Sequence, residues 1–136
     1  MGLALDAEWR LAPGQLPLQQ IGSVDAAEIN KTSQWLATLT RDNQLPQKSL
    51  ILHQFSMSMI ENRQAINTQH PELAFVLHAD GHGTPDLKTG TWNALQEGLP
   101  KGIRMAWKNF YDEDTPMYTP QQTYALDPKP WFVSYQ

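Results

Sequence analysis

Cysteine is absent from this sequence of 136 residues. Its absence excludes disulfide bonds, thiol catalysis and cysteine-ligated zinc. An excess of positive charge is also missing, because 10 Lys and Arg residues stand against 14 Asp and Glu residues and the formal net charge is −4. Binding to nucleic acid or to an anionic membrane normally requires a basic surface. We therefore expect neither kind of partner.

Long hydrophobic runs are lacking as well. No stretch approaches the roughly 20 apolar residues of a membrane span, and we expect no signal peptide before Leu3. The chain opens almost directly on an apolar segment, so we expect it to correspond to part of a larger ancestral domain. Hydrophobic residues make up 40% of the chain, and no linker or repeat divides it. The sequence therefore predicts a single domain over residues 1–136 with a real core.

Five short apolar segments predict β-strands. They are Leu3–Trp9, Ser49–Phe55, Leu73–Asp80, Ile103–Tyr111 and Trp131–Gln136. Four segments between them predict helices, and three of these follow a plausible capping residue. They are Val24–Arg41 after Ser23, Ser56–Thr68, Pro85–Leu99 after Thr84, and Pro120–Leu126 after Thr119. This alternation predicts an α/β fold with a parallel sheet, either an open doubly wound sheet or part of a (β/α)8 TIM barrel.

Polar and ionisable side chains gather at the C-terminal ends of the predicted strands. They are Asp6, Glu8, His53, Gln54, His78, Asp80, Lys108, Asp112, Tyr135 and Gln136. In barrels and in open α/β sheets, the functional site lies at this edge. We therefore predict that Asp6, Glu8 and Asp80 are catalytic and that the other seven residues bind a substrate.

Asp6 and Glu8 are two residues apart, so in a strand they share one face while Trp9 lies on the other. Their Cα atoms would be about 6–7 Å apart, close enough for repulsion to raise one pKa. Glycoside hydrolysis usually needs one protonated and one ionised carboxyl group. The alternative is a solvated strand end in which the pair contacts Arg10. Alternation also places Trp9 and Trp107 away from the site.

Three further motifs each allow two interpretations. His78, Asp80 and His82 have the spacing of metal ligands, but the neighbouring glycines indicate a turning chain, so we predict no metal and no other cofactor. Lys108 lies among aromatic residues and is expected to be partly buried, the alternative being a surface lysine. The acidic run 112–114 is expected to be a solvated loop.

Several longer motifs carry a resemblance to a known family. They are "LALDAEWRL", "LPQKSLILHQF", "ADGHGT", "KNFYDED" and "FVSYQ". Over essentially its whole length the chain resembles the C-terminal half of an uncharacterised, mainly actinobacterial family of exported or lipoprotein-like (β/α)8-barrel proteins related to glycoside hydrolases. The resemblance implies that the five strands correspond to barrel strands four to eight. It also implies an exported or cell-envelope location.

The Asp-x-Glu motif at the end of the first strand is similar to those of family 18 and family 25 glycoside hydrolases, although the longer upstream motif of family 18 is missing. The resemblance implies that Glu8 is the general acid and Asp6 its helper. We therefore expect a glycoside hydrolase-like protein that acts on or binds a carbohydrate or cell-wall glycan. The alternative is a non-catalytic module that binds a carbohydrate or another small molecule in the same cleft. A half-barrel also exposes two sheet edges, so we expect self-association through them.

Overall fold

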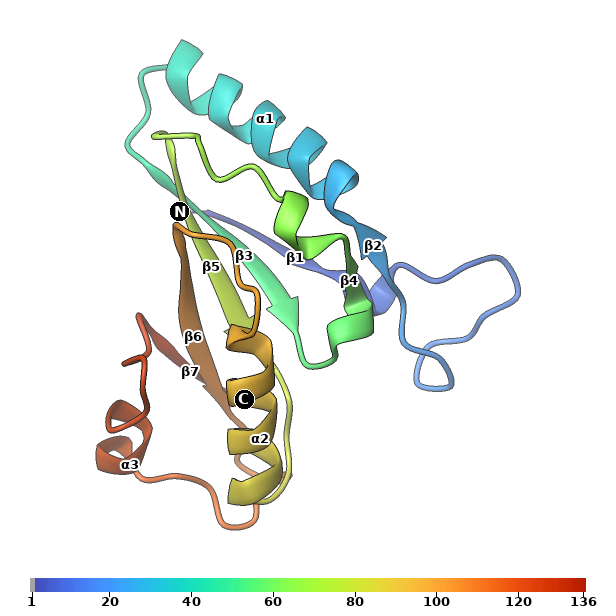
Figure 1. The fold of residues 1–136 in the computed structure, drawn as a ribbon, viewed down its shortest axis with the longest axis vertical. Coiled ribbons are helices and arrows are strands. Elements are labelled where there is room, and N and C mark those ends of the chain that lie inside the picture. The colour runs from blue at the N-terminus through green and yellow to red at the C-terminus, as the bar shows by residue number, and fades with distance from the viewer. Residues whose placement is uncertain (1) are drawn as a thin grey trace.

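A computed structural model describes residues 2–136 (Figure 1). Within these residues the main sheet consists of β1 (Leu3–Asp6), β3 (Lys48–Gln54), β5 (Leu73–Ala79), β6 (Ile103–Asn109) and β7 (Val133–Tyr135). The helices are α1 (Ala26–Asp42), α2 (Pro85–Gln96) and α3 (Pro120–Tyr124). A second, two-stranded sheet pairs β2 (Val24–Asp25) with β4 (Ile60–Glu61). The five predicted strands are confirmed.

The five strands of the main sheet are all parallel and follow one another in space in the order of the sequence, β1-β3-β5-β6-β7. A doubly wound sheet reverses its strand order at a switch point, and this sheet has no reversal. Right-handed crossovers between sequential neighbours place every helix on the same face. The sheet therefore curls as a half-barrel (Figure 1), and the doubly wound alternative is wrong.

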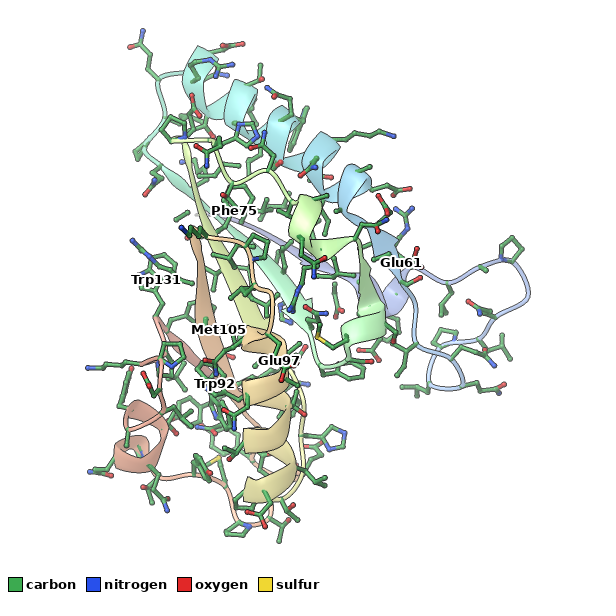
Figure 2. The ribbon with its side chains drawn as sticks, in the orientation of Figure 1. Glu61, Phe75, Trp92, Glu97, Met105 and Trp131 are labelled. Carbon is green, nitrogen blue, oxygen red and sulfur yellow. The ribbon has the colours of Figure 1, made fainter. Side chains whose placement is uncertain are left out.

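The core lies between the convex face of the sheet and the helices. Alternate strand residues such as Leu52, Leu77 and Trp107 are fully buried in one cluster with residues of α1 and α2. Trp92 of α2 packs edge-on against Trp107, with 5.4 Å between ring centroids. Figure 2 shows Trp92 and Met105 in the layer between α2 and β6. Because side chains alternate along a strand, the residues between these core positions face the concave side.

The predicted helix over Ser56–Thr68 is wrong. The segment instead contains two single 3-10 turns, Met57–Met59 and Arg63–Ala65, separated by β4. Asn62 adopts the left-handed conformation (φ 52°), which interrupts helical backbone geometry. The guanidinium of Arg63 is buried, where it donates to the Gln54 side chain and to the Glu97 carbonyl. Three helices are therefore present among residues 2–136 rather than four.

The other predicted helices are confirmed with adjusted ends. Helix α1 begins at Ala26 because Asp25, not Ser23, caps it by accepting a hydrogen bond from Ala27 N at 2.7 Å. Thr119 caps α3 in a complete capping box with Gln122, as its position before a proline predicts. No helix among residues 2–136 has the length and apolar character needed to cross a bilayer.

Strand β1 ends at Asp6, three residues earlier than predicted, and Ala7–Trp9 form a 3-10 turn. Asp6 caps this turn by accepting a hydrogen bond from Glu8 N at 3.1 Å. The prediction that Asp6 and Glu8 share a strand face is therefore wrong, because Glu8 has already left the strand. A hydrogen bond from Gly22 N to Glu8 O at 2.9 Å also fixes this turn.

Candidate functional site

Neighbouring strands align polar side chains in a row across the concave face. Asp6 of β1 is in register with His53 of β3, and His53 is in register with His78 of β5. Lys108 alternates with the core residue Trp107 on β6 and therefore points to the same side. Parallel pairing without reversal thus brings side chains from far-apart segments to the C-terminal edge, as predicted.

Asp80, directly after β5, is the centre of this group. Its Oδ2 accepts a hydrogen bond from His53 Nδ1 at 2.7 Å, and its Oδ1 lies 2.7 Å from the Lys108 ammonium. The Asp80 side chain is only 9% exposed. Burial alone would raise the pKa of Asp80, but the hydrogen bonds and positive charges of His53 and Lys108 outweigh it and lower that pKa. Asp80 is therefore ionised at neutral pH.

Glu8 has the opposite shift. Burial raises the pKa of Glu8, the negative charges of Asp6 and Asp80 raise it further, and Lys108 opposes them only in part. Two carboxyl groups at one sheet edge therefore differ in proton affinity, with Asp80 favouring the ionised form and Glu8 holding its proton to higher pH. A pair divided in this way is the usual arrangement for general acid catalysis.

Trp9 completes the entrance to the site. Its indole Nε1 donates to Asp6 Oδ2 at 3.1 Å, while 56% of the residue remains exposed. Alternation predicted that Trp9 would face away, and this prediction is wrong because the chain turns after Asp6. A fixed, solvent-facing indole is a common stacking surface for the apolar faces of flat ligands.

A cleft of about 550 Å³ lies at the C-terminal edge of the sheet, and of the groups described above it is lined by Asp6, Glu8, Trp9, Asp80 and Lys108 but not by His53. Its lining residues are Asp6, Glu8, Trp9, Phe55, Asp80, Gly81, His82, Leu87, Thr91, Lys108, Phe110 and Gln136. The volume is within the range of small-molecule sites. The cleft combines carboxylates with aromatic walls, which suits a polar ligand that also presents apolar faces.

His78 lies deeper on the concave face. It is 3% exposed, its Nε2 shares a 3.0 Å hydrogen bond with Ser134 Oγ, and its ring meets His53 edge-on at 4.7 Å. Burial, together with the neighbouring His53, lowers the pKa of His78 to about 4. His78 is therefore neutral at physiological pH, and its ring packs against the ring of His53.

A buried ion pair fixes the end of β6 behind the cleft. Lys88 Nζ lies 2.6 Å from Asp114 Oδ2 and donates to the Lys108 carbonyl at 2.7 Å. Asp114 also accepts hydrogen bonds from the backbone N–H groups of Phe110 and Gly83. The pair thus connects α2 with the loop that precedes this helix and with the loop that follows β6. The prediction of a solvated acidic loop is wrong for Asp114.

His53 and His78 do not line the cleft, and three further predicted residues also fall outside it. Gln54 is fully buried on the convex side, where it bonds Arg63 and the Ser56 carbonyl. Asp112 is exposed on the turn after β6 and does not line the cleft. Tyr135 stacks on Tyr111 at 5.7 Å between centroids, also outside the lining. Gln54 and Tyr135 follow the opposite alternation from His53 and Ser134, which explains their placement.

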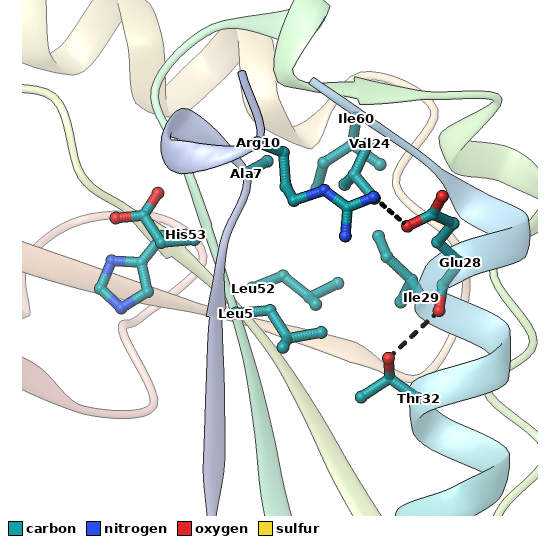
Figure 3. A pocket seen from close by; sticks show the side chains of 11 residues that line it. Leu5, Ala7, Arg10, Val24, Glu28, Ile29, Thr32, Leu52, His53 and Ile60 are labelled. Carbon is teal, nitrogen blue, oxygen red and sulfur yellow. Dashed lines mark hydrogen bonds and ion pairs between the residues drawn. The ribbon is translucent and has the colours of Figure 1, made fainter. Parts of the chain in front are cut away.

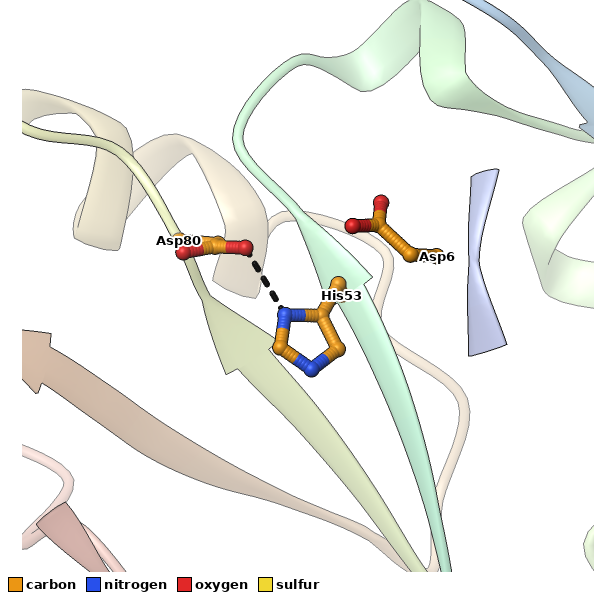
Figure 4. Close-up of side chains that lie close together, drawn as sticks. All are labelled: Asp6, His53 and Asp80. Carbon is orange, nitrogen blue, oxygen red and sulfur yellow. Dashed lines mark hydrogen bonds and ion pairs between the residues drawn. The ribbon is translucent and has the colours of Figure 1, made fainter. Parts of the chain in front are cut away.

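A different set of side chains from the one suggested by the sequence has the spacing of metal ligands. Asp6, His53 and Asp80 each offer one ligand atom, and these atoms lie within 4.8 Å of one another (Figure 4). The Lys108 ammonium already neutralises Asp80 at this point. Lys108 compensates the charge of Asp80 but not that of Asp6, and the group is a hydrogen-bonded and ion-paired cluster centred on Asp80.

A smaller cavity of about 160 Å³ lies on the convex side of β1, against α1. Aliphatic residues including Leu5, Ile29 and Leu52 line it, and the Arg10–Glu28 ion pair lies at its rim (Figure 3). Figure 3 shows His53 on the other side of the strands from these aliphatic side chains. Arg10 therefore pairs with Glu28 and not with Asp6 or Glu8, which contradicts the solvated-pair alternative.

Comparison with known protein families, with curated proteins and with solved structures returns no match for this chain.

Proposed function

We propose that the protein is a glycoside hydrolase-like protein that binds a carbohydrate, such as a cell-wall glycan, in this cleft and acts on it. The observation that carries the proposal is the combination of Glu8, whose pKa is raised, with ionised Asp80 and exposed Trp9 along one cleft. Acid-catalysed glycoside cleavage needs one protonated and one ionised carboxyl group beside the scissile bond. Trp9 supplies a surface on which a sugar ring stacks.

In this proposal Glu8 donates a proton to the glycosidic oxygen as the bond breaks. Asp80, kept ionised by His53 and Lys108, stabilises the positive charge that develops on the sugar. A water molecule then adds to the anomeric carbon and gives up a proton to Glu8, which restores the acid. Asp6 keeps the Glu8 turn and the Trp9 indole in place through its two hydrogen bonds. Lys108 and His53 thus act mainly on the charge and orientation of Asp80.

The test is hydrolysis of a panel of cell-wall and storage glycans by the wild type and by Glu8→Gln. Loss of a general acid lowers the rate by about 10²- to 10⁴-fold, and we expect a decrease of this size with the far-UV circular dichroism unchanged. Asp42→Asn, an exposed carboxylate at the end of α1, is the matched control and should retain full activity.

Two outcomes would change the proposal. Binding of a glycan without hydrolysis, unchanged in Glu8→Gln, would favour the non-catalytic binding module. A failure to bind or cleave any glycan in the panel would exclude both versions.

A further inference from the structure

Two carboxylates of the cleft lack a cationic partner. Among residues 2–136, Asp80 pairs with His53 and Lys108, but no Lys, Arg or His nitrogen lies within ion-pair distance of Asp6 or Glu8. The hydrogen-bond donors to Asp6 are neutral, namely the Trp9 indole and the Glu8 backbone N–H. The cleft therefore carries more negative than positive charge on its Trp9 side.

The local electrostatic potential agrees with this count. Asp6 and Asp80 raise the pKa of Glu8 more strongly than Lys108 lowers it. The negative groups therefore outweigh the lysine at the Glu8 carboxyl, which is only partly buried and faces the cleft. An incoming cation would remove this repulsion, whereas an anionic ligand would increase it.

The exposed indole of Trp9 indicates which kind of ligand would bring a positive charge into the cleft. Its indole is more than half exposed, yet the hydrogen bond to Asp6 fixes its orientation. The face of an indole attracts both the C–H surface of a sugar and a positive charge. The carboxylate of Asp6 lies at the edge of this ring, so one ligand can contact the ring face and the Asp6 carboxylate together.

We propose that the cleft selects a glycan whose sugars carry free amino groups, with the ammonium placed against the Asp6 carboxylate and the sugar ring on Trp9. This inference depends on the proposed function, since it names the substrate class of the same site. An N-acetylated or hydroxylated sugar offers the same ring but no positive charge. The cleft should therefore prefer the amino sugar over either of these.

The test compares three trisaccharides by titration calorimetry: a glucosamine trimer, its N-acetylated form and a glucose trimer. At a pH that keeps the amines protonated, we expect the glucosamine trimer to bind about tenfold more tightly or better, because charge-assisted hydrogen bonds are the stronger kind. Its affinity should fall with added salt, while that of the neutral sugars should not.

Asp6→Asn should weaken binding of the glucosamine trimer more than binding of the two neutral sugars, so the preference should decrease. Asp42→Asn removes one negative charge far from the cleft and should leave the preference unchanged. Trp9→Ala should weaken all three ligands together. Circular dichroism of each variant separates a loss of recognition from a loss of folding.

Equal affinity for the three sugars would overturn this inference and leave the proposed function standing. Binding of trilysine as tight as that of the glucosamine trimer would also overturn it, because the site would then recognise a basic peptide. No binding of any sugar would reject the inference and the proposed function together.

Discussion

At the scale of the residue, the cleft is governed by how charge is distributed among three carboxyl groups. Asp80 has His53 and Lys108 as partners, while Asp6 and Glu8 have each other and neutral donors. The same edge of the sheet therefore contains one carboxylate that stays ionised and one whose proton is retained to higher pH. This division follows from partners within a few ångströms.

The pH dependence of hydrolysis should report the coupling between Asp6 and Glu8. The general acid must be protonated, so activity falls as the pH rises through the pKa of Glu8. Asp6 raises that pKa, and Asp6→Asn should therefore move the alkaline limb of the pH–rate profile to lower pH. Asp6→Asn also lowers the maximum rate, so the height of the pH–rate profile does not test the coupling. The pH at which the alkaline limb falls does test it. An unmoved limb in Asp6→Asn, or one that moves equally in Asp42→Asn, contradicts this coupling.

His78 should make the fold sensitive to acid. Its pKa is lowered from 6.5 to about 4 by burial, so between these values the unfolded chain binds a proton that the folded chain does not. Stability therefore decreases as the pH falls from about 6.5 to about 4, by about 3 kcal/mol for this one group. Urea denaturation across this range should show a shallower decrease in His78→Gln.

The control for that measurement is His70→Gln, which removes a histidine outside the polar row. It should retain the wild-type dependence on pH. If the slopes of the wild type and His78→Gln coincide, His78 does not carry the effect.

The residues of the site divide into those that strand alternation predicts and those that it does not. His53, His78 and Lys108 lie on the concave face, as their positions in uninterrupted strands predict. Trp9 could not be placed in this way, because the hydrogen bond from Glu8 N to Asp6 ends the strand and rotates the indole toward the cleft. The signal was the short polar side chain of Asp6, a residue type that caps turns.

At the scale of the element, the Lys88–Asp114 pair joins α2 to the ends of β5 and β6. Both side chains are almost completely buried, at 4% and 1% exposure. Burial lowers the pKa of Lys88, and Asp114 opposes that shift. The ammonium also donates to the Lys108 carbonyl, so the pair supports the strand that carries a cleft residue.

Removing one partner of the Lys88–Asp114 pair should destabilise the fold. Asp114→Ala leaves a buried ammonium without its counter-ion and should reduce the free energy of unfolding by about 3–5 kcal/mol. The double variant Lys88→Met with Asp114→Leu removes both charges and should recover most of that loss. Urea denaturation of the two variants and the wild type measures both effects. Equal instability of the single and double variants would show that the backbone hydrogen bonds accepted by Asp114, and not its pairing with Lys88, hold these segments together.

The pattern of apolar residues predicts a helix correctly where one face of the helix is buried over several turns, as in α1. The segment 56–68 buries Met59, Ile60, Arg63 and Ile66, a spacing that also fits a helix, yet its backbone is not helical. There the left-handed Asn62 and the buried bonds of Arg63 to β3 and α2 decide the structure. Such long-range partners cannot be inferred from spacing along the chain.

At the scale of the whole molecule, the half-barrel has two free edges. In the part of the chain that the structure describes, β1 pairs only with β3 and β7 pairs only with β6. Unpaired edges of a parallel sheet template further pairing. We expect concentration-dependent association through these edges, visible as a shift in sedimentation velocity.

Ala4→Lys tests this expectation, since Ala4 is an exposed residue on β1 and a charge on an edge strand blocks pairing. The variant should sediment as a smaller species than the wild type at the same concentration. Lys31→Ala, a change of charge on α1, should not alter the sedimentation. A wild type that stays monomeric at every concentration would exclude association through the edges.

The unreversed strand order has a consequence for the synthesis of the chain. Each strand of the main sheet pairs with the strand that precedes it in that sheet, so no early segment must wait for a late one before it finds a neighbour. Contacts between nearby segments form faster than those that close long loops. The sheet can therefore be built one strand at a time as the ribosome releases it, with the residues of the cleft added in order from Asp6 to Gln136.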